Sequence, residues 1–259
     1  MAKEKLQKSE NTGAEFMAAP SRQSGIGSAI SFVLIVVSVI FVMSISFRVK
    51  NVIVTGNEHY SAEEIINAIE IEEGDNLFFF DRFAAVTRVF AKLPYISEVQ
   101  IRRALPDRVT IAVTESNAVA YIKLGSELWT MDEKCKILGK AAEGEEETLI
   151  PVVGFDAGTL FINETLNTAS GEQRSVEYLK EILNQIIGRK LAYQVTRIDM
   201  SNTNNVKISY GGKYTINLGD PYGTEIKFSM VVNAISQLKE GDIGIIDVTD
   251  GRTVRFSPY

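Results

Sequence analysis

The sequence of 259 residues holds few side chains of the types that carry out catalysis. Its single histidine, His59, lies in an expected turn before a helix, and its single cysteine, Cys135, has no histidine matched to it. A Cys–His nucleophilic pair is therefore not expected. Asp75 and Asp81 flank a turn rich in phenylalanine, where carboxylates usually cap loops and helix ends.

Short catalytic motifs are also missing from the sequence. It contains no HExxH metal motif, no nucleophile elbow and no phosphate-binding loop. Asn163-Glu164-Thr165 matches the glycosylation sequon, but the pattern is so short that chance explains it. We therefore expect a protein that is not an enzyme and that uses no catalytic residue, metal, cofactor or small-molecule substrate.

Charge is distributed unevenly along the chain, whose formal net charge is −6. Residues 51–259 hold 21 Lys and Arg against 30 Asp and Glu, a net charge of −9. Proteins that bind nucleic acid usually carry a basic patch or stripe, and this part of the sequence has none. The composition argues against binding of DNA or RNA.

The run 25–47 carries no charged residue over 23 positions. As a helix it is about 34 Å long, enough to cross a hydrocarbon core of ~30 Å with slight tilt. We expect one transmembrane helix over 25–47, with these apolar side chains in the lipid bilayer: Ile30, Phe32, Leu34, Val37, Ile40 and Phe41.

Two alternatives to a membrane anchor stay open. A cleavable signal peptide has an apolar stretch of only ~7–15 residues, although Ser44-Ile45-Ser46 resembles a cleavage site. The other alternative is a helix buried inside a globular domain.

The orientation of the anchor does not follow from charge alone. Arg22 precedes the run, and Arg48 and Lys50 follow it, so the positive-inside bias is nearly balanced. Long domains are exported largely regardless of charge. We expect residues 1–24 to form a cytoplasmic tail and the rest to lie outside the cell membrane, where the single Cys135 precludes an intramolecular disulfide.

Residues 48–117 show the element order β-α-α-β-β. Residues 48–55 have the pattern of a strand, and Ser61 with Glu64 forms a capping box that opens a helix. A second helix is expected from about Asp81 to Leu93. Polar and apolar residues then alternate over 98–102 and 108–114, which predicts two strands whose buried face the helices cover.

This order is that of a POTRA domain, and the sequence resembles the FtsQ/DivIB family of bacterial cell-division proteins. The resemblance lies in the segment 49–57 and in the longer segment 93–115, which contains an Arg-x-x-Pro turn. Ser116 and Asn117 stand where the family usually has Arg and Pro. The resemblance implies a POTRA domain over 48–117.

Residues 118–259 hold more expected strands than helices. Strands are predicted at 118–122, 127–132, 195–200, 206–210, 214–218, 244–248 and 253–256, and helices at 175–191 and 224–238. We expect an α+β chain whose second part is built on a mainly antiparallel sheet with helices. The resemblance identifies 118–259 with the family's β domain.

The last predicted strand is a candidate site for binding a partner. An edge strand presents unpaired N–H and C=O groups that accept a strand from another chain. We expect Thr253 and Arg255 to face one way and Val254 and Phe256 the other, with Pro258 ending the strand. An ordinary closing strand is the alternative.

In the family, this end of the β domain receives FtsL and FtsB-type (DivIC) partners by strand addition. The resemblance therefore makes Arg252, Thr253, Val254, Arg255 and Phe256 the expected partner-binding residues. Residues 246–251 resemble the family's Asp-Leu-Arg-Tyr segment but lack its Arg and Tyr. The binding mode is thus expected to carry over better than its side-chain contacts.

The run Phe78-Phe79-Phe80 lies close to the expected anchor. We expect at least two of these rings to pack under the helices of the first domain. The alternative is that one ring rests in the membrane interface.

These features together predict a bitopic scaffold of the division septum, which binds other single-pass division proteins and helps control septal peptidoglycan synthesis. A membrane-anchored enzyme that modifies the cell wall is one alternative, and it requires paired carboxylates or a metal cluster. A POTRA-containing export or assembly factor is the other, and it requires tandem POTRA units or a barrel.

Overall fold

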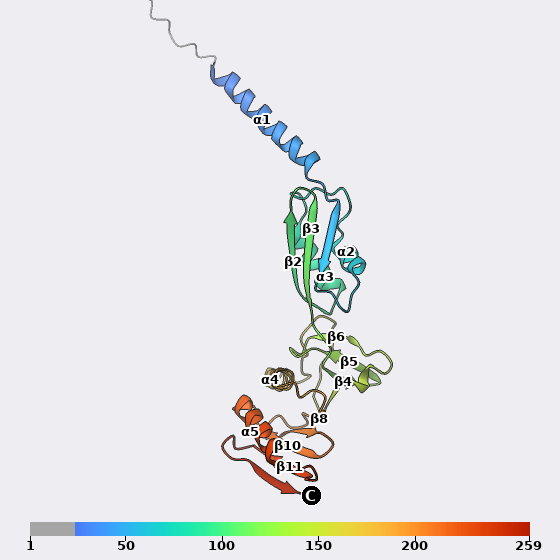
Figure 1. Ribbon diagram of the computed structural model, residues 1–259, viewed down its shortest axis with the longest axis vertical. Coiled ribbons are helices and arrows are strands. Elements are labelled where there is room, and N and C mark those ends of the chain that lie inside the picture. The colour runs from blue at the N-terminus through green and yellow to red at the C-terminus, as the bar shows by residue number, and fades with distance from the viewer. Residues whose placement is uncertain (1–23) are drawn as a thin grey trace, which may run out of the picture.

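The computed structural model describes residues 24–259. The expected tail, residues 1–24, lies outside this range except for its last residue. Figure 1 shows a long helix, a small domain of helices and strands, and a larger sheet domain following one another along the long axis. The predicted fold class, α+β with one N-terminal apolar helix and a sheet-rich C-terminal part, is confirmed.

The apolar run forms helix α1, Ser24–Ser46. Residues 27–46 have a mean hydropathy of 2.7, and none of this segment is buried inside the protein. Within residues 24–259, α1 is the one helix that is long and apolar enough to cross a membrane. The anchor side chains named above project away from the protein, each more than half exposed: Ile30, Phe32, Leu34, Val37, Ile40 and Phe41.

The small domain next to α1, here called the proximal domain, has the predicted β-α-α-β-β order. Its elements are β1 (Asn51–Thr55), α2 (Ala62–Ile69), α3 (Arg82–Lys92), β2 (Ile96–Ala104) and β3 (Arg108–Glu115). The sheet has the order β1-β3-β2, with β1 parallel and β2 antiparallel to β3.

Local sequence signals account for both helices of the proximal domain. Ser61 and Glu64 form the predicted capping box at the start of α2, and the Asp81 carboxylate accepts from the backbone nitrogens of Phe83 and Ala84 at the start of α3. The sheet and helices enclose one apolar core, whose fully buried members include Ile65, Ile69, Ala85, Val89, Ile96 and Ile111.

The phenylalanine run does not pack as predicted. Phe80 lies against the core, but Phe78 and Phe79 are 36% and 67% exposed. The prediction that at least two rings are buried is therefore wrong. The reason is local, because the nitrogens of Phe79 and Phe80 both donate to the Asn76 carbonyl. Within this tight turn the side chain of Leu77, 1% exposed, enters the core, and those of Phe78 and Phe79 remain outside it.

The larger, distal domain carries one sheet of nine strands. Its elements are β4 (Ala120–Leu124), β5 (Glu127–Met131), β6 (Ile137–Lys140), a 3-10 turn η1 (Glu145–Glu147), β7 (Ile150–Val153), α4 (Gln173–Gly188), β8 (Val195–Asp199), β9 (Val206–Tyr210), β10 (Tyr214–Gly219), α5 (Thr224–Gln237), β11 (Gly244–Asp247) and β12 (Arg255–Pro258). The strand order is β12-β11-β10-β9-β8-β7-β4-β5-β6.

Most neighbouring strands of this sheet run antiparallel. The parallel pairs are β4 with β7, β7 with β8 and β10 with β11. Two of them, β7–β8 and β10–β11, are joined through α4 and α5, since a parallel connection needs a crossover. Buried residues of α4, α5 and the strands form a second core.

The distal domain differs from the sequence prediction at three strands. Strands β6 and β7 were not predicted, because Gly139 and Pro151 interrupt their short apolar runs. The last strand begins at Arg255 rather than at Thr253 and includes Pro258, which was expected to end it. The loop before β12 explains the first of these shifts, as described next.

Candidate functional site

Strand β12 lies at one edge of the nine-stranded sheet and pairs only with β11. The nitrogen of Tyr259, just beyond the strand, donates to the Ile243 carbonyl at 3.2 Å. Alternate residues of an antiparallel pair face the partner strand, so Arg255 and Ser257 turn their backbone groups toward β11. The N–H and C=O of Phe256 then point away from the sheet, where no strand among residues 24–259 accepts them.

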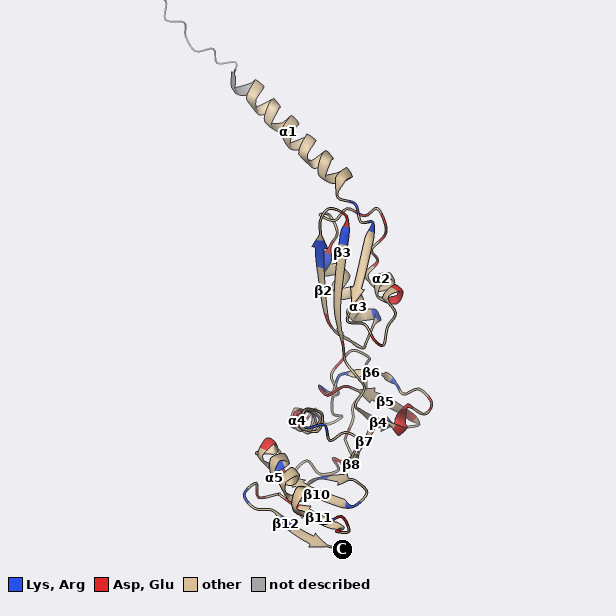
Figure 2. Ribbon diagram, in the orientation of Figure 1, with Lys and Arg blue, Asp and Glu red and all other residues tan. Residues whose placement is uncertain are grey.

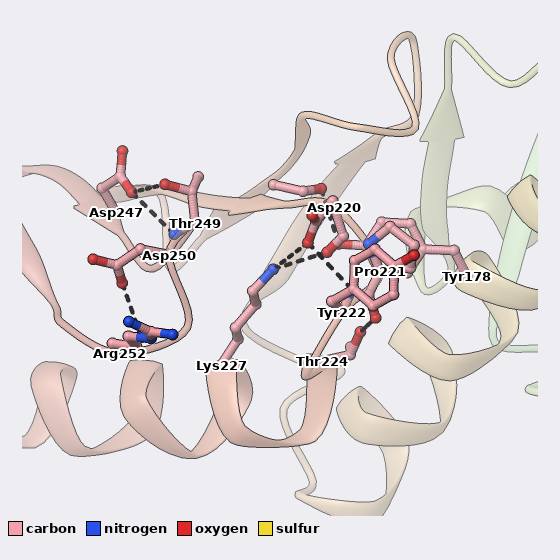
Figure 3. A network of polar contacts seen from close by, with 11 residues as sticks. Tyr178, Asp220, Pro221, Tyr222, Thr224, Lys227, Asp247, Thr249, Asp250 and Arg252 are labelled. Carbon is pink, nitrogen blue, oxygen red and sulfur yellow. Dashed lines mark hydrogen bonds and ion pairs between the residues drawn. The ribbon is translucent and has the colours of Figure 1, made fainter.

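Asp250 sets the point at which β12 begins. Its carboxylate accepts from the nitrogens of Arg252 and Thr253, both at 2.9 Å, and from the Thr253 hydroxyl at 2.6 Å. These hydrogen bonds, those from Thr253 foremost, hold the pKa of Asp250 well below its usual range. Figure 3 shows the Asp250 carboxylate directed at Arg252. These hydrogen bonds hold residues 250–253 in a turn, and the chain joins the sheet only at Arg255.

Side-chain contacts hold β12 against the sheet. The half-buried Phe256 ring meets Tyr214 edge to face, with centroids 6.4 Å apart. A Cβ atom on Gly244 would come within 3.0 Å of that ring, so glycine allows the close approach. Beyond the strand, the Tyr259 hydroxyl donates to the Thr215 hydroxyl at 2.8 Å.

The side chain of Lys227 in α5 lies next to the loop that precedes β12. The residue is 1% exposed, and its Nζ donates to both the carbonyl and the carboxylate of Asp220 at 2.9 Å. The hydrogen bond from Lys227 is the main cause that lowers the pKa of Asp220. A Cβ on Gly251 would lie 3.7 Å from Lys227 Cε, so the lysine stem lies close to this loop. Figure 3 shows the Lys227 side chain extending from its helix toward Asp220.

Comparison with known proteins places these features in a family. Residues 47–116 match the POTRA domain of FtsQ type. The chain is 23% identical to the cell division protein DivIB of Clostridium botulinum strain Hall, over 91% of this chain and 92% of that protein. It is 23% identical to DivIB of Bacillus subtilis, over 83% and 76%, and 25% identical to FtsQ of Syntrophotalea carbinolica, over 81% and 72%.

The chain is similar to the FtsQ/DivIB family of cell-division proteins over most of its length. The proximal domain is accordingly a POTRA domain, and the protein has a role in cell division. Helix α1 fits a single-pass membrane protein. The names of these relatives describe division proteins and no catalysed reaction.

The two residues that the sequence analysis considered for nucleophilic catalysis, His59 and Cys135, lie in different domains. The ring of His59 stacks on Tyr95 with centroids 3.9 Å apart. Cys135 is fully buried in the distal domain, and burial raises the pKa of its thiol to about 12, which keeps it protonated at neutral pH. Within residues 24–259, no group of three or more His, Cys, Asp or Glu side chains could hold a metal ion.

Of the five residues expected to bind a partner, two lie on the edge strand. Arg255 and Phe256 belong to β12, whereas Arg252, Thr253 and Val254 belong to the preceding loop. Thr253 and Val254 therefore do not take part in the predicted strand alternation.

Two residues that shape this site were missed by sequence reasoning. Lys227 gave no sequence signal, because a lysine on a helix usually faces solvent. Asp250 did give one, since an aspartate two to three residues before a threonine commonly accepts bonds from the following backbone nitrogens.

Proposed function

We propose that the protein is a bitopic scaffold of the division septum. Residues 1–24 form its cytoplasmic tail, 25–47 its transmembrane helix, 48–117 the POTRA domain and 118–259 the β domain, with both domains outside the cell membrane. It binds other single-pass division proteins of the FtsL and FtsB/DivIC types and helps control septal peptidoglycan synthesis. It makes or breaks no covalent bond itself.

The free edge of β12 is the observation that carries this proposal. An added strand would satisfy the outward N–H and C=O of Phe256, while Pro258 offers a carbonyl but no N–H and ends the ladder of donors. Arg255 supplies a side chain that is 77% exposed beside this backbone. The exposed loop residues Arg252, Thr253 and Val254 would then meet the partner just before the strand.

The test is to remove the outward donor alone. Phe256→Pro deletes the N–H that faces solvent and leaves the bonds to β11 intact, because those come from Arg255 and Ser257. Phe256→Ala is the matched control, since it removes the ring but keeps the N–H. We expect capture of a purified FtsB/DivIC-type protein by the full chain in detergent to weaken about tenfold more with proline, one hydrogen bond and a steric block being lost.

Equal capture by the proline and alanine variants, with both chains folded by circular dichroism, would refute strand addition at β12. The enzyme alternative predicts turnover of peptidoglycan by the purified protein, so absence of any wall cleavage is expected in the same preparation. The export-factor alternative requires tandem POTRA units, and residues 24–259 contain one such unit.

A further inference from the structure

We infer that the end of the POTRA domain next to α1 is a lipid-binding surface that rests on the bilayer crossed by α1. Its apolar contacts are Phe78, Phe79, Phe83 and Leu105, here called the aromatic tip. This inference rests on the proposed function only in requiring that α1 spans a membrane.

The loop that carries the phenylalanines is bound to the end of α1. The amide nitrogen of Asn76 donates to the carbonyls of Met43 and Ser44, at 3.0 and 3.1 Å. Carbonyls in the last turn of a helix lack partners within the helix, so Asn76 caps α1. The nitrogen of Leu77 also donates to the Phe47 carbonyl at 2.9 Å. The loop is therefore held at the level where α1 leaves the hydrocarbon.

The aromatic tip is exposed although it is strongly apolar. Phe79 is 67% exposed, Phe83 at the start of α3 is 84% exposed, and Leu105 in the β2–β3 turn is 60% exposed. The ring of Phe78 meets Phe47 edge to face, with centroids 5.1 Å apart. Neighbouring exposed apolar side chains of this size mark an interaction surface.

The β2–β3 turn lies at the same end of the domain as the phenylalanine loop. The carbonyl of Asp107 in this turn accepts from the nitrogens of Lys50 and Asn51, at 2.9 and 3.3 Å, where the chain enters β1 from α1. Figure 1 shows the end of β2 and the start of β3 beside the C-terminal end of α1. Leu105 thus approaches the surface from which α1 emerges.

Basic residues lie at the end of the three-stranded sheet next to α1 (Figure 2). Arg102 and Arg103 end β2, Arg108 begins β3, and Lys50 precedes β1. The guanidinium carbon of Arg103 lies 5.9 Å from the centroid of the Phe78 ring, and its Nη2 donates to the Phe80 carbonyl. Lys50 pairs loosely with Asp107 at 3.8 Å. In the part of the chain that the structure describes, Arg102 and Arg108 form no ion pair.

The occupant that fits this surface is the lipid of the same membrane. Only residues 47–50 separate α1 from β1, a span of at most about 14 Å when fully extended. Aromatic rings beside a membrane helix sit at headgroup level, and arginines there meet lipid phosphates. Three arginines, Arg102, Arg103 and Arg108, lie at this end of the sheet although the outer part of the chain is acidic as a whole, and this local positive charge matches an anionic lipid surface.

Tryptophan fluorescence tests the inference on the full chain. The only native tryptophan, Trp129, lies on β5 in the distal domain, so in vesicles with brominated acyl chains its emission should not be quenched. Phe79→Trp and Phe83→Trp each add a reporter while keeping an aromatic ring. In vesicles of seven parts phosphatidylcholine to three parts phosphatidylglycerol, we expect bromination to quench most of the added emission.

Two control variants distinguish failure of the lipid-binding inference from failure of the membrane span of α1. Tyr193→Trp places the reporter at a fully exposed residue of the distal domain, where no quenching is expected. Phe41→Trp places it on α1, where quenching is expected if α1 spans the bilayer. Quenching at Phe41 without quenching at Phe79 and Phe83 would overturn the inference alone. No quenching at Phe41 would overturn the membrane span itself.

A further pair of substitutions tests whether the arginines contribute to binding of anionic lipid. In the Phe79→Trp chain, Arg102→Glu with Arg108→Glu should reduce the quenching in vesicles that contain phosphatidylglycerol and change it less in pure phosphatidylcholine. Quenching that ignores both the lipid charge and these substitutions would refute a role for the arginines. Shielding of the Phe79→Trp reporter only when another division protein is added would refute lipid as the occupant.

Discussion

Asp250 converts a stretch expected to be a strand into a turn, because one carboxylate takes three donors from residues 252 and 253. A similar arrangement precedes it, where the Asp247 carboxylate accepts from the nitrogen and hydroxyl of Thr249 at 3.0 and 2.7 Å. These short-range bonds orient the chain as it enters β12, so the edge strand is presented in one register. The geometry of this loop therefore depends on the Asp247 and Asp250 carboxylates remaining ionised.

Asp250→Ala should lower the melting temperature of the full chain at pH 7. The folded pKa of Asp250 is depressed, so its contribution is complete above the unfolded pKa of about 3.9 and is lost as the pH falls through the lower folded pKa. The melting temperatures of parent and variant should therefore converge in acid. Glu172→Ala is the control, because Glu172 is an exposed carboxylate whose side chain makes no capping hydrogen bond. A gap between parent and Asp250→Ala that stays constant down to pH 2 would contradict this account.

Helix α5 is joined to the sheet by a buried charge as well as by its apolar face. Lys227 is one of the few charged residues buried among residues 24–259, and its partner Asp220 lies in the connection from β10 to α5. The Tyr178 hydroxyl of α4 donates to the neighbouring Gly219 carbonyl at 3.0 Å. The two helices thus meet the end of β10, and the loop before β12 lies over the lysine stem.

Lys227→Met should destabilise the distal domain by about 1–3 kcal/mol, since the carbonyl and carboxylate of Asp220 both lose a charged donor. Urea unfolding of the full chain in detergent, followed by circular dichroism, measures the loss. Lys180→Met on α4 is the matched control, because the Lys180 side chain is 40% exposed and its ion pair with Glu177 is loose, at 3.9 Å. Equal effects of the two substitutions would show that the buried lysine has no structural role.

The two domains are linked by a small number of polar contacts. Nζ of Lys136, in the distal domain, donates to the carbonyls of Pro94 and Ile96 at 2.6 and 3.1 Å. Burial lowers the pKa of Lys136, although the nearby Asp132 carboxylate opposes this shift. The nitrogen of Ser116, at the end of the POTRA domain, donates to the Tyr95 carbonyl at 2.7 Å, so residues 94–96 also hold the point where the chain leaves that domain. This junction sets the direction of the distal sheet relative to the POTRA domain.

Lys136→Met should loosen the arrangement of the two domains without unfolding either. Spin labels at Glu63→Cys on α2 and Glu177→Cys on α4 report the distance between the domains by double electron–electron resonance. We expect a broader distance distribution in the variant, because two backbone carbonyls lose their shared donor. Lys134→Met, an exposed neighbour, should leave the distribution unchanged. An unchanged width in Lys136→Met would show that other contacts hold the junction.

The sequence by itself determined the features that depend on residues close together in the chain. The uncharged run 25–47 indicates α1, Ser61 with Glu64 begins α2, Asp81 begins α3, and alternation over 98–102 and 108–114 identifies β2 and β3. Each of these signals needs only neighbours within a few residues, because capping, periodicity and hydrophobic length are local properties. The POTRA order follows from them, and with the resemblance so does the family.

Only the tertiary structure decided which of these elements meet. It placed β12 at the sheet edge, buried Lys227 beneath Gly251, and brought Leu105 to the same end of the domain as Phe79 and Phe83. None of these follows from periodicity, because long-range strand pairing and the burial of one side chain depend on contacts between distant segments. The free backbone of Phe256 exists because no other part of the described chain pairs with that side of β12.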